Sequence, residues 1–89
     1  MARAIKLSGR EAGVVRAIGF GLGLTGTEVS ERVGMDPEDL VDVLNTLLEA
    51  GYVEAASMRE RVAVADYETE IFEVNPAYTS ELKDVMRRH

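Results

Sequence analysis

Helix start and stop signals divide the first half of this chain into three short helices with brief connections between them. Ser8 and Thr25 are each followed, three residues later, by a glutamate. In such a capping box the hydroxyl accepts from an amide of the first turn, and the glutamate accepts from the amide of the capping residue. Asp36 before Pro37 is a third start signal, because aspartate suits the N-cap and proline the first helical position. Each signal predicts a helix that begins directly after the capping residue.

Glycines and the spacing of apolar residues set the ends and the buried faces of these helices. The first helix is expected to begin at about Gly9 and to end in the glycine-rich stretch 19–23. Glycines at 34 and 51 can cap the next two helices, predicted at about Gly26–Val33 and Pro37–Ala50. Apolar residues three or four positions apart give each helix one core-facing stripe. These stripes comprise Val14, Val15, Ile18 and Leu22, then Val29 and Val33, then Leu40, Val43, Leu44 and Leu47.

The second half of the chain is predicted to form strands and one more helix. Residues Tyr52–Ser57 and Thr69–Val74 have strand character. Residues Met58–Glu68 between them fit either a long hairpin arm or a third short strand. Asn75 followed by Pro76 starts the last helix, whose core-packed face holds Tyr78, Leu82, Val85 and Met86. The 89 residues, 1–89, are therefore expected to form a single domain with the order α-α-α-β-β-α.

Several motifs follow one another in a fixed order along the chain. They are Leu7-Ser8-x-x-Glu11, Leu24-Thr25-x-x-Glu28-Val29-x-x-x-Val33-Gly34, Pro37 with the apolar stripe to Leu47, Gly51-Tyr52-Val53, and Phe72-x-Val74-Asn75-Pro76. Together, over about residues 7–86, they resemble the winged helix-turn-helix regulators of the MarR and ArsR types. The resemblance implies an α+β, mostly α fold: a three-helix helix-turn-helix core, a two-stranded or three-stranded β wing and a C-terminal helix. It also implies that the third helix faces the DNA major groove and the wing faces phosphate or the minor groove.

The charge of the third predicted helix departs from the pattern of such regulators. From Met35 to Met58 the chain has six carboxylates and no Lys, Arg or His, within an overall formal net charge of -6. DNA-reading helices usually present donors to phosphates and bases, whereas carboxylates repel phosphate. We therefore predict that the outer face of this helix, which is acidic and partly aliphatic, docks a protein with a basic or apolar surface. The residues assigned to this face are Glu38, Asp39, Val41, Asp42, Asn45, Leu48 and Glu49.

Two other interpretations of the charges stay open. Glu38 and Asp39 also fit ordinary first-turn acids, which the helix dipole favours, and Leu48 then fits a position in the core. The cations in turn allow a DNA-binding transcription regulator that contacts duplex DNA from the wing and the N-terminal part, with the third helix turned away. The residues for that mode are Arg10, Arg16, Arg32, Arg59 and Arg61. The acidic balance of the chain disfavours DNA as the partner.

Composition and spacing argue against several other classes of function. The chain has no cysteine, so disulfides, thiolate metal sites and thiol catalysis are excluded, and its one histidine is the C-terminal His89. The acids lack the spacing of a calcium loop, and nothing implies a catalytic cleft. We therefore expect a protein that is not an enzyme and uses no metal or cofactor. The absence of a membrane-length apolar run predicts no membrane contact and a cytoplasmic location, and the short ends favour a monomer or small homodimer.

Overall fold

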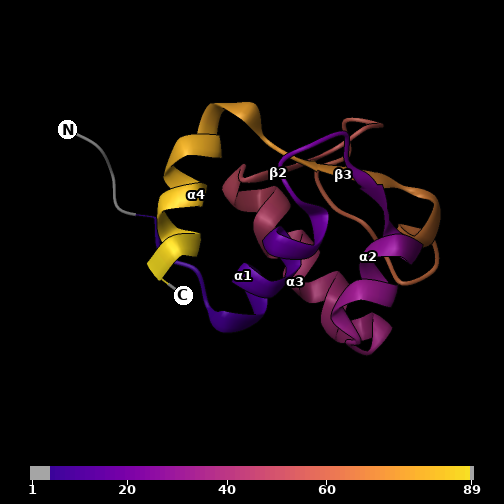
Figure 1. The fold of residues 1–89 in the computed structure, drawn as a ribbon. Helices are drawn as coiled ribbons and strands as arrows, with labels where there is room; N and C mark the ends of the chain where they lie inside the picture. The colour runs from indigo at the N-terminus through magenta and orange to yellow at the C-terminus, as the bar shows by residue number, and fades with distance from the viewer. Residues whose placement is uncertain (1–4, 89) are drawn as a thin grey trace.

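The computed structural model of this chain describes residues 5–88, which form four α-helices and a small antiparallel sheet (Figure 1). The fold is therefore α+β and mostly helical, as predicted. The elements in chain order are α1 (Gly9–Ile18), β1 (Leu24–Thr25), α2 (Gly26–Val33), α3 (Pro37–Ala50), β2 (Val53–Ala55), the 3-10 turn η1 (Tyr67–Thr69), β3 (Ile71–Val74), the 3-10 turn η2 (Pro76–Tyr78) and α4 (Thr79–Arg88).

All three helices begin directly after the predicted capping residues Ser8, Thr25 and Asp36. The Glu11 amide donates to Ser8 Oγ at 3.1 Å, and the Ser8 amide returns a hydrogen bond to Glu11 Oε1 at 2.7 Å. The second box, Thr25 with Glu28, closes in the same way at 3.2 and 2.9 Å. Asp36 stands at the N-cap of α3 and Pro37 at the first helical position, as predicted, although the Asp36 side chain makes no capping hydrogen bond. The start of α3 rests on the proline that follows and on the Asp36 carbonyl, which accepts from Leu40 at 2.9 Å.

The sheet has three strands in the order β1-β3-β2, all antiparallel to their neighbours. Phe72 at the centre of β3 pairs with Leu24 on one side and with Ala55 on the other. The third strand, β1, therefore comes from the connection between α1 and α2, where no strand was predicted from the sequence. Residues 58–66 form neither a hairpin arm nor a strand, so both predictions for that segment were wrong. They form loops and turns, which lead into η1.

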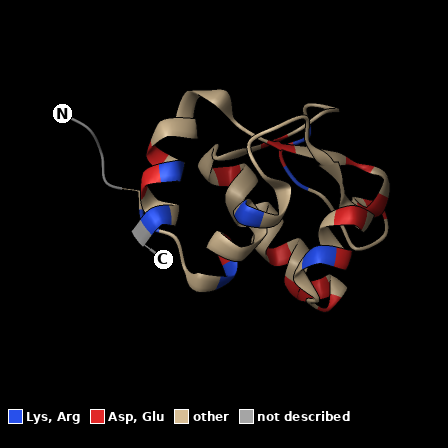
Figure 2. Ribbon diagram, viewed as in Figure 1, with Lys and Arg blue, Asp and Glu red and all other residues tan. Residues whose placement is uncertain are grey.

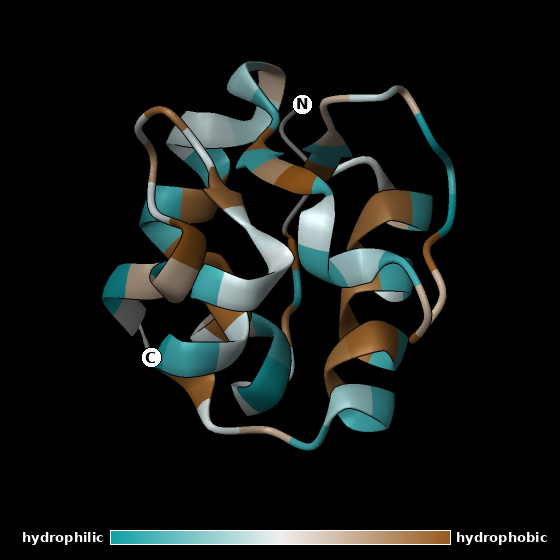
Figure 3. Cartoon of the chain, turned by 90° about the vertical axis from the view of Figure 1, so that its right-hand side faces the viewer, coloured by the Kyte–Doolittle hydropathy of each residue, from teal (hydrophilic) through white to brown (hydrophobic). Residues whose placement is uncertain are grey.

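The core lies between the helices and the inner face of the sheet. Side chains from every layer are fully buried there, including Val14, Leu44, Phe72 and Leu82. Figure 3 shows that the helices carry both apolar (brown) and hydrophilic (teal) residues, as expected for amphipathic helices. Tyr78 and Met86 also pack against this core, as predicted, but Tyr78 belongs to the 3-10 turn η2, because the last α-helix begins at Thr79 and not directly after Asn75. Leu22 does not pack against the core: α1 ends four residues earlier, and the Leu22 side chain is 98% exposed. No helix in the described range 5–88 is long and apolar enough to cross a membrane.

Candidate interaction surface on helix α3

The acids predicted for the outer side of α3 lie in solvent. Glu38, Asp39, Asp42 and Glu49 are all exposed, and we call these four residues the α3 acidic face. Figure 2 shows that acidic residues, in red, gather over the end of the molecule formed by α2 and α3. The carboxylates are there because an amphipathic helix turns its charged positions away from the core.

The aliphatic part of the predicted surface is not available for docking. Val41 is only 7% exposed and Asn45 only 6%, so the assignment of both residues to an open outer face was wrong. Leu48 is half-buried and packs against the core cluster. The reason is the segment 58–66, in which Val62 is itself buried among core residues. This segment covers the side of α3 that helical periodicity alone leaves free.

Asn45 fixes the covering segment to α3 with both groups of its amide. Its Nδ2 donates to the Val62 carbonyl at 3.0 Å, and its Oδ1 accepts from the Val62 amide at 2.7 Å. The side chain thus offers the backbone of the loop the donor and acceptor that a neighbouring strand would offer. Because both hydrogen bonds are buried, breaking them would leave a buried amide and carbonyl without partners.

A buried carboxylate anchors the other end of the same segment. Glu70 accepts hydrogen bonds from the Ser57 hydroxyl, from the Ser57 amide at 3.3 Å and from the Ile71 amide at 3.0 Å. Arg59 lies 3.6 Å from Glu70 Oε1 and 2.9 Å from Asp66 Oδ2, and so joins the two acids. Burial by itself would raise the pKa of Glu70, but the Ser57 and Ile71 hydrogen bonds and the Arg59 charge outweigh it and lower that pKa.

Asp66 closes a tight turn in this network. Its Oδ1 accepts from the Ala63 amide at 2.8 Å, and this hydrogen bond is the main cause of a lowered Asp66 pKa. A smaller effect of desolvation opposes the shift, and Arg59 adds to it. The carboxylates therefore stay ionised at neutral pH and hold the loop between Ser57 and Glu70 in one conformation. Sequence reasoning missed Ser57, Asp66 and Glu70, because their partners are set by a loop path that no periodicity indicates.

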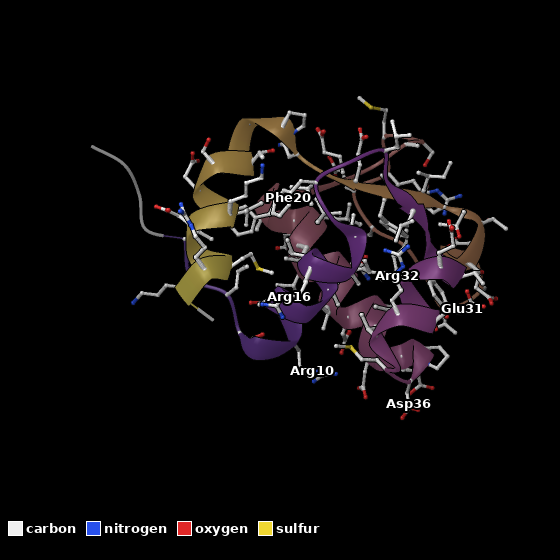
Figure 4. The ribbon with its side chains drawn as sticks, in the orientation of Figure 1. Arg10, Arg16, Phe20, Glu31, Arg32 and Asp36 are labelled. Carbon is white, nitrogen blue, oxygen red and sulfur yellow. The ribbon has the colours of Figure 1, made fainter. Side chains whose placement is uncertain are left out.

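The arginines considered for DNA contact are mostly engaged within the chain. Arg10 lies 3.5 Å from Asp39, Arg61 lies 3.9 Å from Glu49, and Arg59 belongs to the Glu70 network. Arg32 donates to the Ala17 carbonyl at 3.0 Å. Arg16 is exposed and forms no ion pair within residues 5–88. Figure 4 labels Arg10 and Arg16 on α1 and Arg32 on α2, so these three cations come from the α1–α2 part and not from α3.

Two shallow hollows, of which the first is mainly polar, adjoin the α3 acidic face. The first, of about 330 Å³, lies between the start of α1, the middle of α3 and the covering loop. The second, of about 450 Å³, adjoins it and shares Glu49 and Arg61 with it. Both hollows are lined by acidic and basic side chains. Within residues 5–88, no group of three His, Asp or Glu side chains could hold a metal ion. The chemistry of the hollows suits charged side chains of a partner better than an apolar ligand.

Comparison with known proteins leaves the function to be argued from these residues. No protein-family model matches the chain, and the searches against curated proteins and against solved structures found no significant match. The features that remain are the α3 acidic face, the covering loop with its two anchors, and the distribution of arginines around them.

Proposed function

We propose that this chain is a winged-helix domain that acts without catalysis, by binding a basic segment of a protein partner on the α3 acidic face. The order α1-β1-α2-α3-β2-β3-α4 supports the fold assignment, as does the placing of the short β1 beside β3. Gly34, with φ of 67°, makes the tight turn between α2 and α3 that a helix-turn-helix needs. The MarR and ArsR resemblance remains part of the proposal.

The observation that carries the proposal is the sign of the exposed charge on α3. Glu38 and Asp42 form no ion pair within the described residues. Asp39 and Glu49 each face one arginine, but both pairs are long and well exposed, and such pairs contribute little. A Lys-rich or Arg-rich partner can therefore compete for all four carboxylates, and electrostatic attraction would also speed its association.

Duplex DNA is the less favourable partner for the same surface. Four carboxylates close to a groove would repel the phosphates, and Arg59, one of the arginines considered for DNA contact, is held by Asp66 and Glu70. An apolar partner is also less suited than the sequence suggested, because Val41 and Asn45 are buried beneath the loop. The partner we propose is therefore basic, with at most a minor apolar contact at Leu48.

The test compares a basic peptide with DNA on the same protein. We expect a nine-residue oligo-arginine peptide to shift backbone NMR signals of α3 in the ¹⁵N-labelled chain. The double variant Glu38→Gln/Asp42→Asn should weaken this binding about fivefold, since it removes the two carboxylates that have no internal partner. Glu81→Gln/Asp84→Asn on α4 is the matched control, which should bind as the wild type does.

The DNA arm uses a labelled random duplex and fluorescence anisotropy at two salt concentrations. We expect no binding at micromolar protein, even at low salt. Tight binding with a steep salt dependence, reduced by Arg16→Ala, would instead establish the DNA-binding alternative. Peptide shifts that fall on α1 or α4, or that ignore the Glu38 and Asp42 substitutions, would refute α3 as the contact surface.

A further inference from the structure

The outer face of the sheet is a second surface with exposed apolar and acidic side chains. Along β3 the burial alternates, so Phe72 and Val74 face the core while Ile71 and Glu73 face solvent. On β2 the residue that shares the solvent side is Glu54. Ile71 is 44% exposed, although large apolar residues of a sheet normally pack inward.

Two carboxylates lie directly opposite one another on this face. The register of β2 and β3 pairs Glu54 with Glu73. Like charges at directly opposite positions of an antiparallel pair destabilise it. Neither side chain forms an ion pair within the described range of the chain, so no internal cation offsets the repulsion. The arrangement is therefore unfavourable in the free protein, and it would become favourable with an external cation between the two carboxylates.

Exposed apolar residues flank this acidic pair on both sides. The loop before β1 passes so close to β3 that a Cβ built on Gly23 would lie 3.2 Å from Glu73 Cβ and 3.4 Å from Ile71 Cγ2. Leu22, the next residue, is 98% exposed. Beyond β2, Met58 is 87% exposed and has φ of 65°, a left-handed conformation that is unusual for a residue other than glycine. Figure 1 shows the loop before β1 and the loop after β2 at the same end of the molecule, at the top of the view.

We propose that this surface, which we call the sheet face (Leu22, Glu54, Met58, Ile71 and Glu73), binds a partner segment of the pattern apolar-x-Lys/Arg-x-apolar. In an extended segment every second side chain points the same way, so positions i, i+2 and i+4 face the sheet together and span about 13 Å. The three strands span about 10 Å. The central cation then lies between Glu54 and Glu73, and the apolar residues cover the exposed side chains on either side.

This inference is independent of the contact proposed for α3. The sheet face is built by β2, β3 and two loops and shares no residue with the α3 acidic face. The occupant we commit to is a protein segment and not nucleic acid, because the surface holds two carboxylates and no cation. Exposed apolar side chains that gather beside charged ones, as Leu22, Met58 and Ile71 do around Glu54 and Glu73, mark surfaces that bind protein segments.

The binding experiment titrates the ¹⁵N-labelled full chain with the peptide Ser-Val-Ser-Lys-Ser-Val-Ser, blocked at both ends. We expect shifts of the amides of Glu54, Ile71 and Glu73. A peptide with Glu for Lys should not bind, and one with Ser for both Val should bind about fivefold more weakly. Equal binding of all three peptides, shifts confined to α3, or no shift of the sheet amides at millimolar peptide would each overturn the proposal.

Reversing the charge of Glu73 should change stability and peptide binding in opposite directions. We expect Glu73→Lys to raise the Tm of the free protein, because a cross-strand Glu–Lys pair replaces two like charges, while it weakens peptide binding at least about fivefold. Leu22→Ser should leave the Tm unchanged and weaken binding. A residue with a merely structural role would lower the Tm when replaced. Glu73→Lys with an unchanged or lowered Tm, or with undiminished binding, would count against the sheet face as a binding surface.

Discussion

At the scale of the residue, Asn45 has the clearest consequence for stability. We expect Asn45→Ala to lower the free energy of unfolding by about 1–3 kcal/mol, because it leaves the buried amide and carbonyl of Val62 without partners. Urea unfolding measures this change. Thr46→Ala is the matched control, since the Thr46 hydroxyl is exposed and donates only to the Asp42 carbonyl within α3. An Asn45→Ala effect no larger than that of Thr46→Ala would show that the loop is held elsewhere.

At the scale of the element, the segment from Ser57 to Glu70 is predicted to be sensitive to acid. The pKa of Glu70 is lowered from its ordinary value of 4.5. The ionised Glu70 carboxylate therefore stabilises the folded state in full above about pH 4.5, and this stabilisation is lost as the pH falls through the lower pKa of the folded state. Asp66 is shifted in the same direction and adds to the effect. We therefore expect the amides of Ala63 and Ser57 to lose protection, measured against their intrinsic exchange rates, below about pH 4.5 and before the helices unfold.

Glu70→Gln separates this local effect from general acid unfolding. The amide keeps the size of the carboxylate but loses its charge, so we expect the Ser57 amide, which donates to Glu70, to lose most of its protection even at pH 7, with little further change on acidification. Glu68→Gln, at an exposed neighbouring position, should behave as the wild type. If Glu70→Gln kept the wild-type pH profile, the acid sensitivity would have to come from another group.

The same elements show how far the sequence could lead. The bounds of α2 and α3 followed from local signals, because capping boxes, Pro37 and the glycine caps act within a few residues. The loop 58–66 could not be predicted in this way, since its anchors join residues 13 and 17 positions apart. The exposure of the acids on α3 was predictable because charged residues are seldom buried. The burial of Val41 could not be predicted. Helical periodicity identifies the side of α3 that faces away from the core, but it does not show that another segment covers that side.

At the scale of the whole molecule, the excess of acids over cations predicts a stability that rises with salt. The chain has 16 Asp and Glu against 10 Lys and Arg. The repulsion is concentrated over α3 and between Glu54 and Glu73, whereas the pairs Arg10–Asp39 and Arg61–Glu49 are long and exposed. Salt screens exposed charges, and because most exposed charges of this chain are acidic, it removes more repulsion than attraction. The buried Glu70 network is screened much less. We expect the Tm to rise by a few degrees between about 10 and 150 mM NaCl, over which the Debye length falls from about 30 to about 8 Å.

Thermal unfolding followed by circular dichroism measures this dependence. Glu73→Lys is the informative comparison, because it removes two units of negative charge and one like-charge pair at once. Its Tm should be higher than that of the wild type at low salt, and its increase on adding salt should be smaller. Glu81→Lys on α4 changes the net charge equally but lies outside both acidic surfaces, so its salt dependence should stay closer to that of the wild type. A wild-type Tm that falls as salt is added would mean that the ion pairs outweigh the repulsion, and the unsatisfied charge on which both proposed surfaces depend would then be absent.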